Sequence, residues 1–320
     1  MAAPHAPTLP PPAAPSARRA VPNPHPEGYC LPVRLALHAT PPGGVRYALT
    51  SFWEARHAGQ VQRTTIEKAL TLHFEWASAG HGHLTYQAAP PHLRKPDPSA
   101  FEKALLLLAT LYQHLELDVS PAGQLLALRN YAAILAAWQA VQQELVQRSG
   151  GEDDVTQQLL ASVGGLLQTP ANFLVSLGYD YTFGWLLPDF YGQRFESGWR
   201  YEQPRCFARF FAAADMWFAE QLELGPAPAA GQVALHLRGQ LDASRTDLAA
   251  VAEQVDAERV AAGIVAPATS PTAIAGAYEA TYLLDQATGW PVALDASVWC
   301  QAGPDYRKEY FFRLEQLPAL

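Results

Sequence analysis

Hydrophobic and polar residues alternate along both ends of the chain. Between residues 66 and 76, Ile66, Leu70, Leu72 and Phe74 are separated by polar side chains. Residues 276–315 repeat the pattern in three runs, separated by the turn sequences Asp-Gln-Ala-Thr-Gly and Ala-Gly-Pro-Asp. Successive side chains of a strand point to opposite faces, so these runs predict antiparallel strands with one buried and one wetter face.

The first ninety residues predict a meander of such strands. Residues 29–40 and 45–55 alternate on either side of Pro-Pro-Gly-Gly, which predicts a hairpin. Further strands are expected over residues 66–76 and 83–88. Beyond residue 214 the chain returns to strands, interrupted by one helix that we expect to begin at Asp242 or Ser244.

The middle of the chain changes to a helical period. Ser99 and Glu102 have the spacing of a capping box, which predicts a helix over residues 98–114. The sequence Ser-Pro-Ala-Gly then predicts the turn of a second hairpin. Asn130 is a predicted cap for the next helix, and the predicted helices that follow the hairpin cover residues 131–148, 153–167 and 170–177.

This order of elements favours an α+β fold, because strands and helices do not alternate as they do around a parallel sheet. We predict a strongly curved antiparallel sheet, a half-barrel, that is formed by the N- and C-terminal meanders and packed on the helical middle segment. The predicted organisation is a disordered tail rich in Pro and Ala and then a single domain, with boundaries at 1–27 (tail), 28–320 (domain), 28–90 (meander), 91–178 (helices with one hairpin), 179–213 (aromatic connection) and 214–320 (strands with one helix).

Two segments carry a resemblance to known proteins. They are Leu-Asp-Val-Ser-Pro-Ala-Gly-Gln-Leu-Leu-Ala-Leu-Arg-Asn-Tyr and Gly-Ala-Tyr-Glu-Ala-Thr-Tyr-Leu-Leu-Asp-Gln-Ala-Thr-Gly-Trp. Their pattern resembles uncharacterised β-rich proteins of the Bacteroidota and the half-barrel form of the LolA/LolB-like lipoprotein carriers. The resemblance implies a fold. It transfers no functional residue. The chain departs from those carriers in showing neither their signal peptide nor their lipobox cysteine, so we do not expect periplasmic lipid transport.

Composition narrows the classes of partner. Of the 320 residues, 49% are hydrophobic and 16% charged, and the net charge is −8. No basic stripe is visible, so we expect no nucleic-acid partner. No run reaches the roughly 18 apolar residues that a membrane span needs, so we expect no membrane span. We also expect a cytoplasmic protein. Three widely spaced cysteines, Cys30, Cys206 and Cys300, are expected to be reduced thiols.

Motifs for chemistry are sparse. The sequence contains no phosphate-binding glycine loop and no nucleophile elbow, and we expect no cofactor. His81 and His83 flank a glycine, and either His73 or His92 could complete a metal site with them. The flanking Ser-Ala-Gly favours a solvated turn, so no metal site is predicted.

The densest candidate is the aromatic segment between residues 179 and 199. Asp180, Asp189 and Glu196 lie among its rings, as carboxylates do in a glycosidase cleft. Packing of the rings as a lid over the curved sheet is the simpler interpretation. We predict no catalytic residue, and the residues predicted to contact a ligand or partner are Tyr179, Tyr181, Trp185, Asp189, Tyr191 and Trp199.

Three functions remain open at this point. The first is a non-catalytic binding or assembly protein, such as an adaptor or a chaperone-like factor with a protein partner. The second is a carrier that holds an apolar small molecule or lipid within the curved sheet. The third is a carbohydrate-active hydrolase that uses Asp180 or Asp189.

Overall fold

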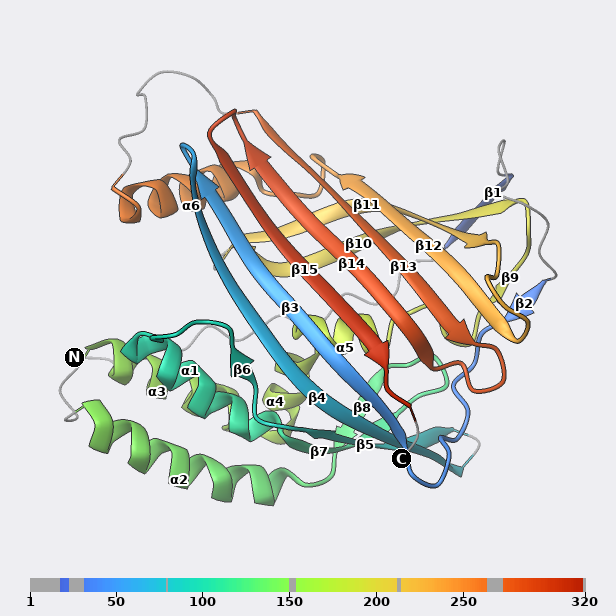
Figure 1. The fold of residues 1–320 in the computed structure, drawn as a ribbon, viewed down its shortest axis with the longest axis horizontal. Coiled ribbons are helices and arrows are strands. Elements are labelled where there is room, and N and C mark those ends of the chain that lie inside the picture. Colours follow the sequence, from blue (N-terminus) through green and yellow to red (C-terminus); the bar gives the residue numbers. More distant parts are fainter. Residues whose placement is uncertain are drawn as a thin grey trace.

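A computed structural model describes residues 18–22, 32–78, 80–149, 154–211, 214–263 and 273–318. Over these ranges the chain forms a large antiparallel sheet with helices packed beside it (Figure 1). The predicted α+β class with an antiparallel sheet is therefore confirmed.

The main sheet contains thirteen strands in the order β1-β10-β11-β12-β13-β14-β15-β3-β4-β5-β7-β8, with β6 paired to β4. All neighbouring strands in this sheet run antiparallel to each other. The strands are β1 (Arg19–Pro22), β3 (Val45–His57), β4 (Gln60–Ser78), β5 (His81–Ala88), β6 (His92–Leu93), β7 (His114–Val119), β8 (Leu125–Leu128), β10 (Trp199–Phe211), β11 (Ala214–Gly225), β12 (Gln232–Leu241), β13 (Ile274–Asp285), β14 (Pro291–Ala302) and β15 (Tyr306–Gln316).

The N- and C-terminal meanders meet at one pair of strands. β15 runs along most of β3, from Tyr306 opposite His57 to Gln316 opposite Tyr47. This pairing confirms the prediction that the two meanders join into a single sheet. The sheet does not close on itself, because β1 and β8 end the strand order among the residues that the structure describes.

Period-two patterning explains which side of the sheet is buried. In β14, Leu294, Ala296, Val298, Cys300 and Ala302 are all buried, and the residues between them are more exposed. Each large apolar side chain that is removed from water contributes roughly 1.5–3 kcal/mol. The inward face of the long strands is therefore the main source of stability.

The helices follow the predicted order. α1 begins with the predicted capping box, in which Ser99 accepts from the Glu102 amide and Glu102 accepts from the Ser99 amide. It continues into a short 3-10 helix. The helical elements are α1 (Ala100–Leu108), η1 (Ala109–Tyr112), α2 (Tyr131–Ser149), α3 (Asp154–Leu166), α4 (Pro170–Gly178), α5 (Tyr181–Leu186) and α6 (Leu248–Ala261).

The N-terminal region differs from the prediction. Residues 18–22 lie within the predicted disordered tail, yet residues 19–22 form the edge strand β1 against β10; the rest of 1–27 lies outside the described residues.

The predicted hairpin of 29–40 with 45–55 is wrong. Of this first segment the structure describes residues 32–40, and among them only β2 (Val33–Arg34) is a strand, which pairs with β9 (Arg194–Phe195) in a separate small sheet. Residue 38 then bonds to the turn before β14.

The predicted connection over 179–213 is also wrong in part. It contains helix α5 and most of the long strand β10, which spans Trp199–Phe211. The polar residues Gln203 and Arg205 interrupt the hydrophobic alternation of this strand, so its pattern did not predict a sheet position.

Two predicted helix caps are replaced by other contacts. Asn130 does precede α2, and its carbonyl accepts from the Ile134 amide, but its side chain bonds to β7 instead: Oδ1 accepts from the Glu116 amide and Nδ2 donates to the carbonyl of His114. Asp247 caps α6, whereas Asp242 accepts from the amide and hydroxyl of Ser244 in the preceding turn.

The membrane prediction can be compared with the described helices. None of them is by itself long and apolar enough to cross a bilayer. Thr156–Leu166 and Pro170–Gly178 reach that length and composition only together, across a bend of 105°.

Candidate functional site

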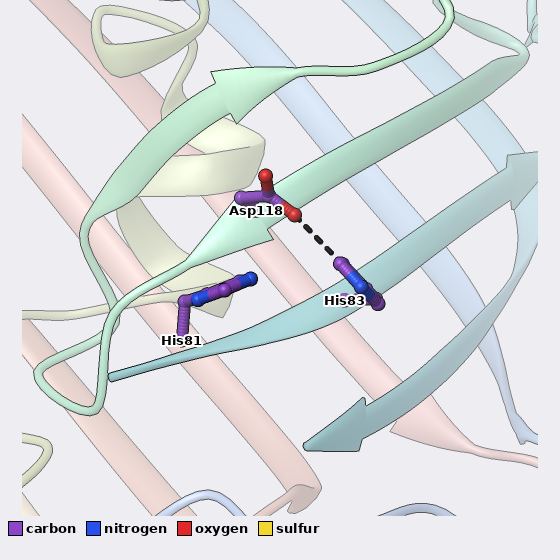
Figure 2. Close-up of side chains that lie close together, drawn as sticks. All are labelled: His81, His83 and Asp118. Atoms are coloured by element: carbon purple, nitrogen blue, oxygen red, sulfur yellow. Dashed lines mark hydrogen bonds and ion pairs between the residues drawn. The ribbon is translucent and has the colours of Figure 1, made fainter. Parts of the chain in front are cut away.

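The His-Gly-His sequence opens strand β5 and is not the predicted turn. His81 and His83 point to the same outer face of the sheet, and Asp118 of the neighbouring strand β7 lies opposite His83 (Figure 2). His73 and His92, the companions considered from sequence, are not members of this group. Over the described ranges, this trio is the His/Cys/Asp/Glu cluster whose geometry suits a metal ion.

Two of the six predicted contact residues, Trp185 and Tyr191, belong to the hydrophobic core, and Tyr181 is partly buried against it. Tyr181 and Trp185 lie on α5, and Tyr191 follows it. The Tyr181 hydroxyl donates to the Ala208 carbonyl (3.0 Å) and the Tyr191 hydroxyl to the Gly289 carbonyl (2.9 Å). Burial raises the pKa of both tyrosines, so both hydroxyls stay neutral. The Trp185 and Tyr191 rings are therefore packed inside the protein and do not form a contact surface.

Two others lie nearer the surface. Tyr179 is the C-terminal cap of α4, and the Arg209 guanidinium lies 6.0 Å from its ring centroid. Trp199 opens β10 opposite Pro22 of β1 and is 39% exposed. The aromatic segment between residues 179 and 199 is thus mostly packed against the core, and its Trp199 end is exposed. This agrees with the lid interpretation for most of its rings.

Asp189, the sixth, helps to hold the N-terminal strand in place. Arg18, whose side chain is only 6% exposed, donates to Asp189 (2.6 Å), Gln193 (2.9 Å) and Gln203 (2.5 Å). Gln203 also donates to both carboxylate oxygens of Asp189. These bonds tie the start of β1 to the aromatic segment.

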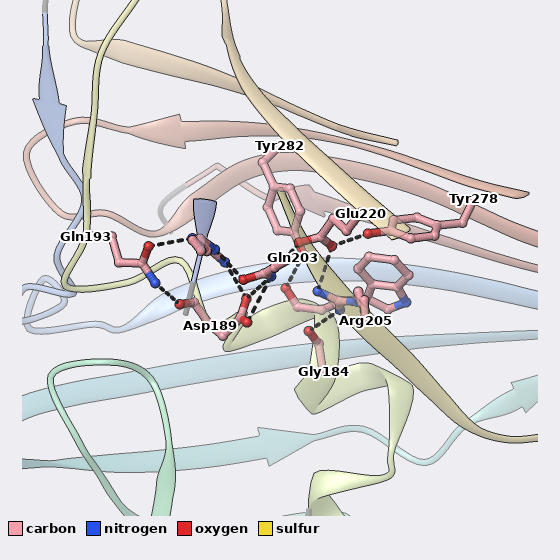
Figure 3. A network of polar contacts seen from close by, with 10 residues as sticks. Gly184, Asp189, Gln193, Gln203, Arg205, Glu220, Tyr278 and Tyr282 are labelled. Atoms are coloured by element: carbon pink, nitrogen blue, oxygen red, sulfur yellow. Dashed lines mark hydrogen bonds and ion pairs between the residues drawn. The ribbon is translucent and has the colours of Figure 1, made fainter. Parts of the chain in front are cut away.

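The same polar network continues into the core at Glu220. Gln203 lies directly opposite Glu220 across β10 and β11 and donates to it (2.5 Å). The Tyr278 hydroxyl, from β13, also donates to Glu220 (Figure 3). It reaches across Gly239 of β12, where a Cβ atom would lie 2.1 Å from the tyrosine ring. A glycine is therefore required between the two strands.

Arg205 supplies the positive charge of this buried network. Its guanidinium lies 3.6 Å from the Glu220 carboxylate, donates to the Gly184 carbonyl (3.1 Å) and stacks 4.8 Å from the Trp185 ring. Burial acts to lower the pKa of Arg205, but Glu220 raises it overall, so the arginine stays charged. Burial raises the pKa of Glu220 by more than Arg205 lowers it. A packed cluster of this kind fixes the position of α5 against the sheet.

A cavity of about 250 Å³ lies between the inner face of β3 and β4 and the helix α1. Leu49, Ile66, Leu93, Leu105 and Leu106 supply apolar surface to its wall. Leu105 is also exposed to solvent, so the cavity wall continues to the surface of α1. None of the residues in the Glu220 network lines it. The polar lining groups are Ser51, Thr64, Lys68, Glu102, Tyr112, Gln113, Asp180 and Thr182.

Lys68 is the unusual residue of this cavity. It occupies an inward position of β4, between Ile66 and Leu70, and its ammonium group lies 5.7 Å from the Tyr86 ring centroid. Burial acts to lower the pKa of Lys68, but Tyr86 and the Asp180 carboxylate raise it overall. The cavity therefore presents a stable positive charge in a mainly apolar wall. The charged residue in an alternating apolar run was the sequence signal that could have identified it.

Asp180 and Glu102 both line the cavity, which is the arrangement that the hydrolase hypothesis requires. Each is engaged as a cap: Asp180 accepts from the Thr182 amide (2.7 Å), and Glu102 accepts from the Ser99 amide and Lys95. Lys95 and Ser99 lower the pKa of Glu102 to about 2. Glu102 is thus ionised at neutral pH and is unsuited to the role of general acid.

The cysteines offer no activated nucleophile among the described residues. Cys206 and Cys300 are free thiols, and Cys30 lies outside the described residues. Burial raises the pKa of both described thiols to about 12, so neither forms a thiolate at neutral pH.

Comparison with known proteins gives no family assignment. No protein-family model matches the chain, and no curated protein matches it at significant similarity. The functional argument therefore depends on the cavity and on the side chains around it.

Proposed function

We propose that the protein binds an apolar small molecule with one polar end in the cavity between α1 and strands β3 and β4. The observation that carries this proposal is the leucine-lined space of about 250 Å³ with Lys68 in its wall. An apolar cavity of roughly 150 Å³ is enough to bind benzene. The space is thus adequate for a small aromatic molecule or a short acyl chain.

The charges around the cavity indicate the chemistry of the polar end. Asp180 balances Lys68, and Lys95 balances Glu102. A ligand with a full charge would disturb this balance. We therefore expect a neutral ligand whose hydrogen-bond acceptor meets the Lys68 ammonium group, while Ser51 and Thr64 offer further hydroxyls.

In this proposal the protein is a carrier whose sheet is curved as a half-barrel. The curved strands form the rigid wall of the binding site, and α1 forms the movable wall. Phe101 and Leu105 on the outer surface of α1 are exposed, which is consistent with an entry path beside this helix.

Native mass spectrometry of the full chain, purified from its own host, tests the proposal directly. We expect the folded protein to carry a small apolar molecule in addition to its own mass. Ala109→Phe places a ring in the cavity and should abolish this adduct, because Ala109 lines the space. Ala133→Phe, on an exposed position of α2, is the matched control and should keep it.

A fluorescence titration with N-phenyl-1-naphthylamine, a neutral apolar probe, provides a second measurement. The probe should bind the wild type and Ala133→Phe, and bind Ala109→Phe at least about tenfold more weakly. The proposal fails if the native protein carries no small molecule and the probe binds both variants equally.

One observation favours the adaptor alternative. Strand β8 ends the sheet among the described strands, and Leu126 within it is 48% exposed. An edge of this kind can pair with a strand of another protein. The same mass spectrometry experiment separates the two functions, because an adaptor would carry a protein and not a small molecule.

A further inference from the structure

The outer face of β5 presents two imidazoles at a fixed separation. Gly82 lies between His81 and His83 and faces the interior of the protein. A Cβ atom on Gly82 would lie 2.4 Å from the Phe74 ring, so the packing of Phe74 requires a glycine between the two histidines. The register of both imidazoles is thereby set by the core. Their ring centroids are 5.5 Å apart.

A carboxylate from the neighbouring strand completes the group. Asp118 lies opposite His83 in register, and its Oδ1 is 2.7 Å from His83 Nδ1. One ligand atom from each of the three residues lies within 4.8 Å of the other two (Figure 2). Ligand atoms around a tetrahedral ion with bonds of about 2.0–2.1 Å are roughly 3.3 Å apart. A small side-chain rotation of His81 would close the set.

The surrounding charges both support and oppose a cation. Burial acts to raise the pKa of Asp118, but Arg129 and His83 lower it overall, so the carboxylate is ionised. Glu75 lies opposite His83 on the other neighbouring strand and adds negative charge on the same face. The opposing group is Arg129, whose Nε donates to Asp118 Oδ1 (2.7 Å).

Arg129 is able to give way. Its side chain is 46% exposed, so it can move into solvent when a cation takes its place. Within the described residues, both hydrogen bonds of the Asp118 carboxylate use Oδ1, which leaves Oδ2 open to a cation. His81 Nδ1 lies 3.1 Å from the hydroxyl of Ser78, an exposed residue that can also turn into solvent.

We propose that His81, His83 and Asp118 form a surface site for a divalent first-row transition-metal ion, which displaces Arg129 from Asp118. Two imidazoles and one carboxylate suit Zn²⁺, Ni²⁺ or Cu²⁺, whereas Mg²⁺ and Ca²⁺ require more oxygen ligands. Three protein ligands leave at least one position for water or for a donor from another molecule. This proposal is independent of the small-molecule cavity, because none of its residues lines that space.

Isothermal titration of the untagged full chain with Zn²⁺ tests the site. The buffer should be at about pH 7.5, because protons compete with a metal ion for imidazole ligands at lower pH. We expect one equivalent of Zn²⁺ to bind the wild type. His83→Gln and Asp118→Asn should each weaken binding at least about tenfold. His92→Gln, at an exposed position of β6, is the matched control and should not change it.

Arg129→Gln gives the sharpest test, because the expected change has the opposite sign. Removal of the competing cation should tighten Zn²⁺ binding several-fold, a gain that a misfolded variant would not produce. The proposal is overturned if Zn²⁺ binds more weakly than about millimolar, or if His83→Gln binds as tightly as the wild type. It is also overturned if Arg129→Gln weakens binding, or if Mg²⁺ binds as tightly as Zn²⁺.

Discussion

Trp185 offers the clearest test of whether the aromatic segment is core or recognition surface. Its side chain is 1% exposed and packs among the rings of Phe207, Tyr278 and Phe312. Burial of an aromatic side chain removes roughly 150–250 Å² from water. At about 25 cal/mol per Å² this contributes roughly 4–6 kcal/mol.

One feature reduces that figure. Within the part of the chain that the structure describes, the Trp185 indole N–H has no hydrogen-bond partner. Such an orphaned donor costs roughly 1–3 kcal/mol. Substitution of Trp185 also removes the ring that stacks on the buried Arg205 guanidinium. The loss of this contact leaves the charge less well stabilised and raises the cost of the substitution. We therefore expect Trp185→Ala to lower the free energy of unfolding by about 4 kcal/mol, within the usual range for such truncations.

Urea denaturation followed by far-UV circular dichroism measures this change. Trp199→Ala is the matched control: the same substitution in the same segment, at a side chain that is 39% exposed. It should cost about 1 kcal/mol or less. Trp185→Phe keeps most of the buried ring and removes the orphaned N–H, so it should cost less than half as much as Trp185→Ala. If Trp185→Ala costs no more than Trp199→Ala, the assignment of Trp185 to the core is refuted.

Three further predictions concern the polar network. Arg18→Ala should remove the anchor of β1 at a cost of about 1–3 kcal/mol, reduced because Asp189 is 41% exposed, and amide exchange of residues 19–21 should become markedly faster; unchanged exchange would contradict it. Because the pKa of Glu220 is raised in the folded state, its protonated side chain stabilises the fold at a pH below the ordinary pKa of 4.5. That stabilisation is lost as the pH rises through the folded-state pKa. Glu220→Gln should therefore lose less stability than the wild type over that rise, as measured by urea unfolding across a pH series, and an identical pH profile would contradict this. Gly239→Ala should cost roughly 1–3 kcal/mol in the same assay, because the new methyl group collides with the Tyr278 ring, and a neutral result would contradict the close approach.

The sequence predicted the elements whose own pattern decides their structure. The alternation in β4 and in β13 to β15 placed these strands correctly, and the spacing of Ser99 and Glu102 placed the start of α1. The meeting of β3 and β15 followed from the need of two amphipathic meanders to bury one common face.

The failures occurred where tertiary contacts override the local pattern. β10 carries Gln203 and Arg205 on its buried side, and these are tolerated only because Glu220 lies across the strand boundary. The alternating residues 29–40 suggested a strand, but Leu35 and His38 bond to loops far along the chain. Lys68 shows the opposite case. Its position fits the strand pattern, so the pattern alone does not reveal that a charged side chain lies on the inward face.

The junction of β3 and β15 has a consequence for biosynthesis. β15 is synthesised long after β3, and until it arrives the thirteen residues of β3 keep one row of backbone donors and acceptors unpaired. Such a row is a template for other nascent chains, and pairing over so long a sequence separation is slow. We therefore expect the yield of folded protein during overexpression to depend on chaperones, and chains that terminate before residue 306 to aggregate.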